Sequence, residues 1–322
     1  MRAAAVLFAI AASAGTALAG TPGDFNDVYI ISDAHNEVYQ FNRNGTYVNG
    51  NHVGGAMPLV FSNQAQVGGI AAYTGAFGGF TNNFFIGGFS GVTEINSNTG
   101  NFVRSYGGFS RRPGVAISPI GTLLTSGPAG VDEWDTTNGN YIRTIPGGGA
   151  DNQLMALRGN DLFIATWSSA GNGIEVRDYV TGNTIAPTIP VPFGPHEIEI
   201  GPDGALYATS LYEFNPAMTG VWRYDFGTGV WSPFALAAAA GGSGVYTNGP
   251  HCFAFDPITG HLLTAFADGS IHKWNGATGA YIGVFGFVPT KLTDILFKPI
   301  PTPGAAMVLA MGGAMIAGRR RR

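Results

Sequence analysis

The strongest constraint on the fold of this chain is a sequence repeat that recurs six times. Each copy is anchored on a glycine that follows Asn or Thr, and the intervals between anchors are 55, 39, 43, 47 and 50 residues. The anchors are Gly45, Gly100, Gly139, Gly182, Gly229 and Gly279. A repeat of about 47 residues indicates a set of equivalent structural units that build one fold together.

The residues around each anchor predict a β-hairpin. A β-branched apolar residue lies upstream, and an aromatic and a β-branched residue usually follow, as in Tyr141-Ile142 and Tyr281-Ile282. This composition is typical of strands. A few residues before the glycine stands an Asx residue, such as Asp135. Its side chain can accept hydrogen bonds from backbone amides, and the glycine can adopt a positive φ, so the chain is expected to reverse there.

A second strand pair precedes several of these hairpins, with its turn built from Pro and Gly. It is seen in residues 114–124, 197–207 and 252–263, and Asn160-Asp161 supplies the turn in another copy. Four strands in about 47 residues is the arithmetic of a β-propeller blade. We therefore predict an all-β, six-bladed β-propeller with four-stranded blades over residues 24–299.

The two ends of this region complement each other. Residues 27–32 form a strand with no inner strand before it, whereas residues 292–299 form an inner strand with no hairpin after it. We expect these N- and C-terminal strands to pair and close the ring, because closure leaves no unpaired sheet edge.

Parts of the repeat resemble known propeller families. Residues 267–282 and the Val131–Asp135 segment, with Trp274 and Trp134, resemble the second half of a WD repeat. The Pro-x-Gly-x-Leu turns resemble those of NHL-type and gluconolactonase-like six-bladed propellers. This resemblance implies an architecture and no particular activity, since propellers host many unrelated functions.

Composition and charge exclude several classes of protein. A hydrophobic content of 45% with a net charge of -4 is not that of a disordered chain, and 50 glycines without a three-residue period are not collagen. Without the predicted terminal signals, 11 basic residues face 20 acidic ones, a net charge of -9. A region with this negative charge is repelled by the phosphates of nucleic acid, so a nucleic-acid-binding function is excluded. Cys252 is alone, so no intramolecular disulfide is expected.

The first residues predict a secretory signal peptide at 1–19. Arg2 precedes an apolar run from Ala3 to Ala12, and Ala17 and Ala19 are the small residues that signal peptidase requires at its cleavage site. We therefore expect an exported protein, located in the cell envelope, at the cell surface or outside the cell.

The last residues, 301–322, resemble a PEP-CTERM sorting tail. A short apolar stretch, Ala305 to Ala317, is expected to form a helix of about 20 Å, too short for a stable span of the membrane. On either side stand the tripeptide and the arginine cluster: Pro301, Thr302, Pro303, Arg319, Arg320, Arg321 and Arg322. Thr302 replaces the central Glu of the family motif. The resemblance implies transient membrane contact and an exosortase-like processing enzyme as a partner.

The best candidate binding residues fall at equal positions on the predicted inner strands, at one mouth of the propeller channel. His196, His251 and Thr293 each lie six residues before a turn proline, and Gln153 is the match in a copy without that proline. Imidazoles at equivalent positions can ligate a metal or bind a sugar or carboxylate, with Glu197 to balance charge. Alternatively, they are features of the repeat that bond the backbone between blades.

Two functions are compatible with these features. The first is a non-catalytic binding module for an envelope polysaccharide or protein, with no cofactor. The second is a metal-dependent lactonase or hydrolase of the gluconolactonase-like type, for which a divalent metal would be needed. The scattered His and Glu residues do not form the carboxylate-rich set that such an enzyme requires, so the first function is favoured.

Overall fold

The structure is a computed structural model, and the ranges that it describes follow. They are residues 27–32, 37–48, 59–60, 69–73, 83–88, 91–97, 101–107, 114–127, 129–147, 154–166, 172–210, 217–241 and 249–297. The predicted signal peptide at 1–19, the predicted tail at 301–322, their expected helices, and Gln153 lie outside these residues. No helix in the described part of the chain is both long and apolar enough to cross a membrane.

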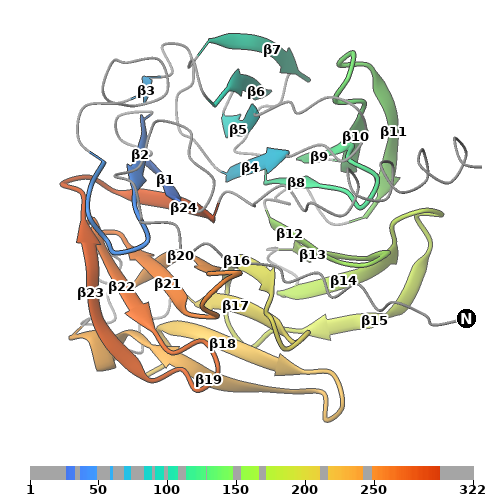
Figure 1. Ribbon diagram of the computed structural model, residues 1–322. Coiled ribbons are helices and arrows are strands. Elements are labelled where there is room, and N and C mark those ends of the chain that lie inside the picture. The colour runs from blue at the N-terminus through green and yellow to red at the C-terminus, as the bar shows by residue number, and fades with distance from the viewer. Residues whose placement is uncertain are drawn as a thin grey trace, which may run out of the picture.

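The described residues form six four-stranded antiparallel sheets, arranged as blades around a common axis (Figure 1). Blade 1 contains β24 (Leu292–Phe297), β1 (Val28–Ser32), β2 (Glu37–Phe41) and β3 (Leu59–Val60). Blade 2 contains β4 (Gly69–Tyr73), β5 (Asn83–Gly88), β6 (Gly91–Asn96) and β7 (Phe102–Tyr106). Blade 3 contains β8 (Val115–Ile117), β9 (Leu123–Gly127), β10 (Gly130–Trp134) and β11 (Tyr141–Pro146). The predicted six-bladed β-propeller is confirmed.

The second half of the ring has the same plan. Blade 4 contains β12 (Leu154–Arg158), β13 (Asp161–Thr166), β14 (Gly173–Asp178) and β15 (Thr184–Pro190). Blade 5 contains β16 (Pro195–Ile200), β17 (Leu206–Ser210), β18 (Gly220–Asp225) and β19 (Val230–Leu236), and a short 3-10 helix, η1 (Ala237–Ala240), follows it. Blade 6 contains β20 (Pro250–Phe255), β21 (Leu262–Phe266), β22 (Ser270–Trp274) and β23 (Tyr281–Phe287).

The ring closes as the sequence predicts. β1 pairs antiparallel with β24, so that Val28 lies opposite Phe297 and Ile30 opposite Ile295. The innermost strands β24, β4, β8, β12, β16 and β20 each contact the next around the axis. Closure therefore joins the two ends of the described chain in one sheet, and the inner edges of all six blades face one another (Figure 1).

The repeated turns have the predicted chemistry. In blade 3, Asp135 Oδ1 accepts the Thr137 backbone N–H at 2.7 Å, and Gly139 turns the chain with a φ of 80°. In blade 5, Asp225 Oδ1 accepts backbone N–H groups in the same way, and Gly229 has a φ of 70°. Each turn carries the chain from the third strand of its blade to the outermost one.

Among the described residues, buried hydrophobic side chains form six core clusters, and each lies between two neighbouring blades. One example joins Tyr207 of blade 5 to Phe253 and Trp274 of blade 6. Another joins Ile30 and Phe297 of blade 1 to Cys252 of blade 6. Because every blade is packed on both faces, the ends of the innermost strands are held at fixed positions around the axis.

Candidate functional site

Three neighbouring inner strands have a β-bulge near their first residues, and the candidate residues lie in those bulges. In β16, the register passes from Pro195–Ser210 to Ile198–Ala208, so His196 and Glu197 face the single residue Thr209. In β20, the step from Pro250–Phe266 to Cys252–Ala265 leaves His251 as the extra residue. In β24, the register shift between Asp294 and Leu292 falls at Thr293.

The other three inner strands pair regularly over their described residues. The registers of β4, β8 and β12 run without a shift. A bulge twists its strand and redirects a side chain, and bulges are common beside functional sites. The blade 5, 6 and 1 side of the axis is therefore distinguished from the opposite side by backbone geometry as well as by residue type.

The structure brings His196 and His251 into contact. Their rings pack edge to face, with centroids 4.8 Å apart and an angle of 88° between their planes. His196 Nδ1 lies 2.9 Å from the His251 main-chain oxygen, and because a carbonyl oxygen only accepts, Nδ1 is the donor of this hydrogen bond. His251 is buried and His196 is half-buried. The imidazole pair thus spans the boundary between blades 5 and 6.

Thr293, the third member of the predicted ring position, is tied to its own blade. It is buried, and its hydroxyl lies 3.5 Å from the Ile31 main-chain oxygen in β1. Nearby, Ser32 Oγ and Thr290 Oγ1 form a 2.8 Å hydrogen bond. Gln153, the fourth candidate, remains a prediction because it lies outside the described residues.

Three carboxyl groups, on the innermost strands β16 and β24, interact with one another electrostatically. Glu197 interacts electrostatically with both Glu199 and Asp294. Asp294 is buried, and its two oxygens accept the backbone N–H groups of Ile70 and Ile295 at 2.7 Å each. Glu197 and Glu199 keep some accessible surface although protein surrounds them, as expected of groups that line the inside of a ring. We call these three residues the axial carboxyl cluster.

Burial controls the protonation of the axial carboxyl cluster. It raises the pKa of Glu199 to about 8, against a smaller lowering by the Phe255 backbone hydrogen bond. It also raises the pKa of Asp294 to about 7, although two backbone hydrogen bonds oppose it. The pKa of Glu197 is well above its usual value, first because of burial and then because of the charges of Asp294 and Glu199. The cluster therefore holds protons near neutral pH.

Cys252 lies beside the cluster on β20 and is unreactive. It is fully buried in the core between blades 6 and 1. Burial, followed by the charges of Asp294 and Glu197, raises the pKa of its thiol well above the ordinary value. It is a free cysteine, and the thiolate needed for nucleophilic or metal chemistry is disfavoured. Among the described residues, no group of three or more His, Cys, Asp or Glu side chains is arranged to hold a metal ion.

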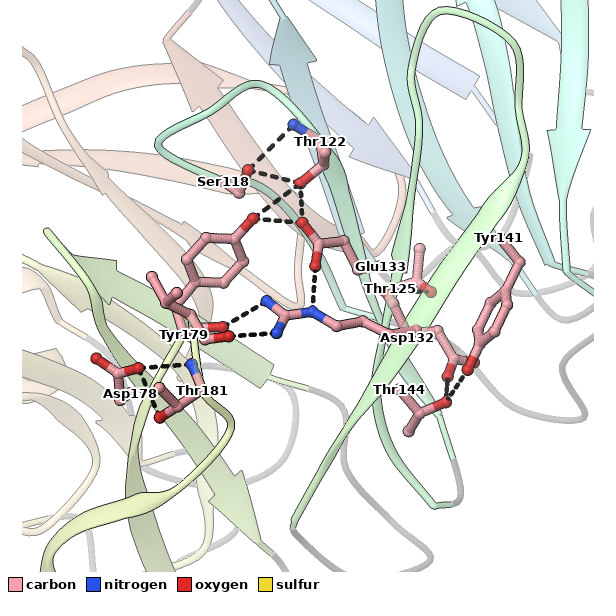
Figure 2. A network of polar contacts seen from close by, with 12 residues as sticks. Ser118, Thr122, Thr125, Asp132, Glu133, Tyr141, Thr144, Asp178, Tyr179 and Thr181 are labelled. Carbon is pink, nitrogen blue, oxygen red and sulfur yellow. Dashed lines mark hydrogen bonds and ion pairs between the residues drawn. The ribbon is translucent and has the colours of Figure 1, made fainter.

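A different kind of polar cluster joins blades 3 and 4 (Figure 2). Glu133 of β10 accepts hydrogen bonds from the Thr122 hydroxyl at 2.5 Å, from Arg143 Nε at 2.7 Å and from the Tyr179 hydroxyl. Arg143 also donates to the main-chain oxygens of Tyr179 and Val180 in blade 4. Ser118 Oγ bonds Thr122 Oγ1 at 2.6 Å. This network fastens one blade to the next and lies away from the candidate site.

Sequence reasoning assigned His196, His251 and Thr293 to one shared position and missed the bulges in which they lie. The equal spacing of His196, His251 and Thr293 from their prolines was a usable signal for a shared position. The bulges have no comparable signal, because none of the three is marked by glycine. Thr209, opposite the His196–Glu197 bulge, was not recognised, since its neighbours read as an ordinary buried strand.

No protein-family model and no curated protein matches this chain. Solved structures do. The chain is similar to one in the crystal structure of a nidogen/laminin complex, with a TM-score of 0.60 and 13% identity over 84% of this chain and 99% of that one. It is also similar to a chain of Kuenenia stuttgartiensis hydrazine synthase, with a TM-score of 0.57 and 15% identity over 83% of this chain and 79% of that one.

A third similarity is partial. A chain in the crystal structure of the mitotic checkpoint complex has a TM-score of 0.48 and 19% identity, and this chain spans 63% of its length, less than two thirds. Because identities are this low, the first two similarities show the fold and nothing of ligand or activity. The fold and its neighbours define the protein as a six-bladed β-propeller.

Proposed function

We propose that this propeller is a non-catalytic binding module that holds an envelope polysaccharide or protein at the end of the axis where β16 and β20 begin. The main support is that three neighbouring inner strands each carry a bulge at the same position, and that His196, His251 and Thr293 lie in these bulges. A set of bulged strands on one side of a ring is a built feature, and a ligand at the axis would meet all three together.

The chemistry of this end suits a polar ligand. Imidazole and hydroxyl groups both donate and accept hydrogen bonds, which matches the hydroxyl groups of a sugar or the main chain of a peptide. The imidazole pair is held rigid by its edge-to-face contact and by the bond from His196 Nδ1 to the His251 main-chain oxygen. A preorganised site of this kind binds without an ordering cost.

We also propose that the protein is exported and sorted to the cell surface by its termini. The support is sequence alone: Ala17 and Ala19 after an apolar run, and the Pro301–Pro303 tripeptide ahead of an apolar stretch and arginines. Mass spectrometry of the protein from its native cell tests both ends. We expect an N-terminus near Gly20 and loss of the terminal arginines, and an intact Arg319–Arg322 end would contradict the sorting proposal.

Binding is tested on a glycan array with the purified full-length protein and three variants. We expect a glycan that binds in the presence of chelator, and at least tenfold weaker binding by His196→Ala and His251→Ala, a loss of about 1.4 kcal/mol. His261→Ala is the matched control, because His261 follows the turn at the other end of β20. Binding that chelation abolishes would favour the lactonase alternative. Binding that ignores both histidines would contradict the proposed site.

A further inference from the structure

We propose that the ligand at this end of the axis carries a primary ammonium group, supplied by an amino sugar, which the axial carboxyl cluster neutralises. This inference rests on the proposed function and adds to it the chemical class of the ligand. It is carried by the charges around the axis, by buried polar atoms without partners, and by the geometry of the β16 bulge.

The first observation is a group of acidic residues that the arginines do not neutralise. Every described arginine is paired with a carboxylate outside the cluster. The pairs are Arg43–Asp256, Arg104–Glu94, Arg143–Glu133, Arg158–Asp161, Arg177–Glu175 and Arg223–Asp203. Glu197, Glu199 and Asp294 instead interact with one another electrostatically, Asp294 raising the pKa of both glutamates. Carboxyl groups that share a site without a cation repel each other once ionised, so a cationic ligand is favoured there.

The second observation is independent of charge. In the described part of the chain, the Thr209 hydroxyl and Glu199 Oε2 are buried and have no hydrogen-bond partner. Thr209 is completely buried and lies opposite the His196–Glu197 bulge. Glu199 of β16 lies opposite Tyr207, which is two residues before Thr209 in β17, so Glu199 and Thr209 are on the same face of the sheet. Buried polar groups are nearly always satisfied, so two such atoms on one face point to a partner that comes from outside the chain.

The donors of an ammonium group match these acceptors. It carries three N–H donors and no acceptor, whereas a carboxylate oxygen accepts and a hydroxyl can do so. When the ammonium enters, a carboxylic acid of the cluster gives its proton to solvent, and the resulting carboxylate forms an ion pair with the ligand. The raised pKa values of Glu199 and Asp294 mean that binding at neutral pH releases protons.

The rim of the site favours a sugar over a lysine side chain as the source of this ammonium. Next to Glu197 stand the imidazoles of His196 and His251, which are in contact with each other. Groups that both donate and accept are suited to ring hydroxyls, which do the same. A lysine would bring a four-carbon apolar stem past these polar groups and leave them without partners.

The experiment compares two ligands that differ only in the amine. Calorimetry at pH 7 measures binding of a glucosamine hexamer and of an N-acetylglucosamine hexamer to the full-length protein, in two buffers of different ionisation enthalpy. We expect the free-amine hexamer to bind at least tenfold more tightly and to release protons. Glu197→Gln should remove at least ninety per cent of that preference, and Glu175→Gln, a half-buried glutamate on β14 paired with Arg177, should leave it unchanged.

Each alternative outcome is informative. Equal binding of both hexamers that still depends on His196 would overturn this inference and leave the proposed function standing. No binding of any glycan, on the array or here, would overturn this inference and leave a protein as the ligand of the proposed function. Binding of a lysine peptide in place of the hexamers, or of a stoichiometric divalent ion lost in Glu197→Gln, would also overturn it. The comparison of ligands uses the unaltered protein, so the test holds even where a variant folds poorly.

Discussion

Two sets of carboxyl groups lie inside this propeller, one between blades 3 and 4 and one around the axis. Glu133, in the first set, is buried, which by itself would raise its pKa. Hydrogen bonds from Thr122, Tyr179 and Arg143 outweigh that effect and lower the pKa below its usual value. Glu199, in the second set, has one backbone donor and a pKa raised to about 8. Burial is common to both, so the supply of donors decides the charge.

The comparison separates stability from function within one fold. Figure 2 shows a carboxylate whose hydrogen bonds are supplied from both sides of a blade boundary, and such a group holds the boundary together. In the axial cluster, Glu199 has one backbone donor and Asp294 has two, and burial still raises the pKa of both, so the ionised cluster is in an unfavourable state that a ligand can relieve. Residues with perturbed pKa values gather at functional sites for this reason.

The largest expected effect comes from removing the satisfied carboxylate. Glu133→Ala leaves the Thr122 and Tyr179 hydroxyls and the Arg143 guanidinium without their acceptor. We expect the free energy of unfolding to fall by about 3 to 5 kcal/mol, as when one partner of a buried ion pair is removed. Urea unfolding followed by tryptophan fluorescence measures the change.

The control for this prediction is Glu175→Ala. Glu175 also pairs with an arginine, Arg177, at 2.7 Å, but the Glu175 side chain is 24% exposed, against 3% for Glu133. We expect a loss below about 1 kcal/mol there. Equal losses in the two variants would show that Glu133 contributes only as a surface charge does, and the distinction between the two carboxyl sets would then be lost.

The local parts of this structure could be predicted from sequence, and the parts made by neighbouring blades could not. The turn at Gly139 and the pairing of the N-terminal strand with the C-terminal strand follow from residue types and spacing, and both are confirmed. Glu133 stands in an alternating stretch that reads like any half-exposed strand. Its burial and its donor Tyr179 come from blade 4, 46 residues along the chain.

The same limit applies to the candidate site. Spacing placed His196 and His251 at one level, and the structure puts their rings in contact. Bulges occur in β16, β20 and β24 and not in the described residues of β4, β8 and β12. This difference depends on how the sheets twist against one another. The protonation of Glu199 depends equally on the packing around it, which no single strand specifies.

The second prediction concerns pH, because the two carboxyl sets act in opposite directions. A carboxyl group with a raised pKa binds protons in the folded state, so stability falls as pH rises from its unfolded pKa to its folded pKa. For Glu199 that window runs from 4.5 to about 8, and for Asp294 from 3.8 to about 7. Glu133 has a lowered pKa, so its contribution is lost only in acid, as pH falls through its folded pKa.

Glu199→Gln isolates the axial contribution. Gln cannot ionise, so at pH 5 the variant should match the unaltered protein within about 1 kcal/mol, and at pH 9 it should be more stable by about 2 to 4 kcal/mol. Urea unfolding at several pH values measures both differences. A difference that does not change between pH 5 and pH 9 would show that Glu199 has the same pKa in the folded and unfolded states.

The smallest expected effect concerns two single hydroxyl groups in neighbouring blades, one with a hydrogen-bond partner and one without. Thr264 and Thr209 are both completely buried, in β21 and β17. The Thr264 hydroxyl accepts the Trp274 indole N–H at 2.9 Å, whereas the Thr209 hydroxyl has no partner in the described part of the chain. Replacing each by Val removes only the hydroxyl and keeps the branched shape, so the pair differs in the partner that is left behind.

Thr264→Val should lower the free energy of unfolding by about 1 to 2 kcal/mol, because it leaves a buried indole N–H unsatisfied. Thr209→Val should change it by no more than about 0.5 kcal/mol in either direction, since an unpaired hydroxyl loses no bond. Urea unfolding of the two variants, without ligand, measures the contrast. A loss at Thr209 as large as that at Thr264 would mean that its hydroxyl is already satisfied in the free protein, and the site would then have one fewer acceptor to offer an ammonium group.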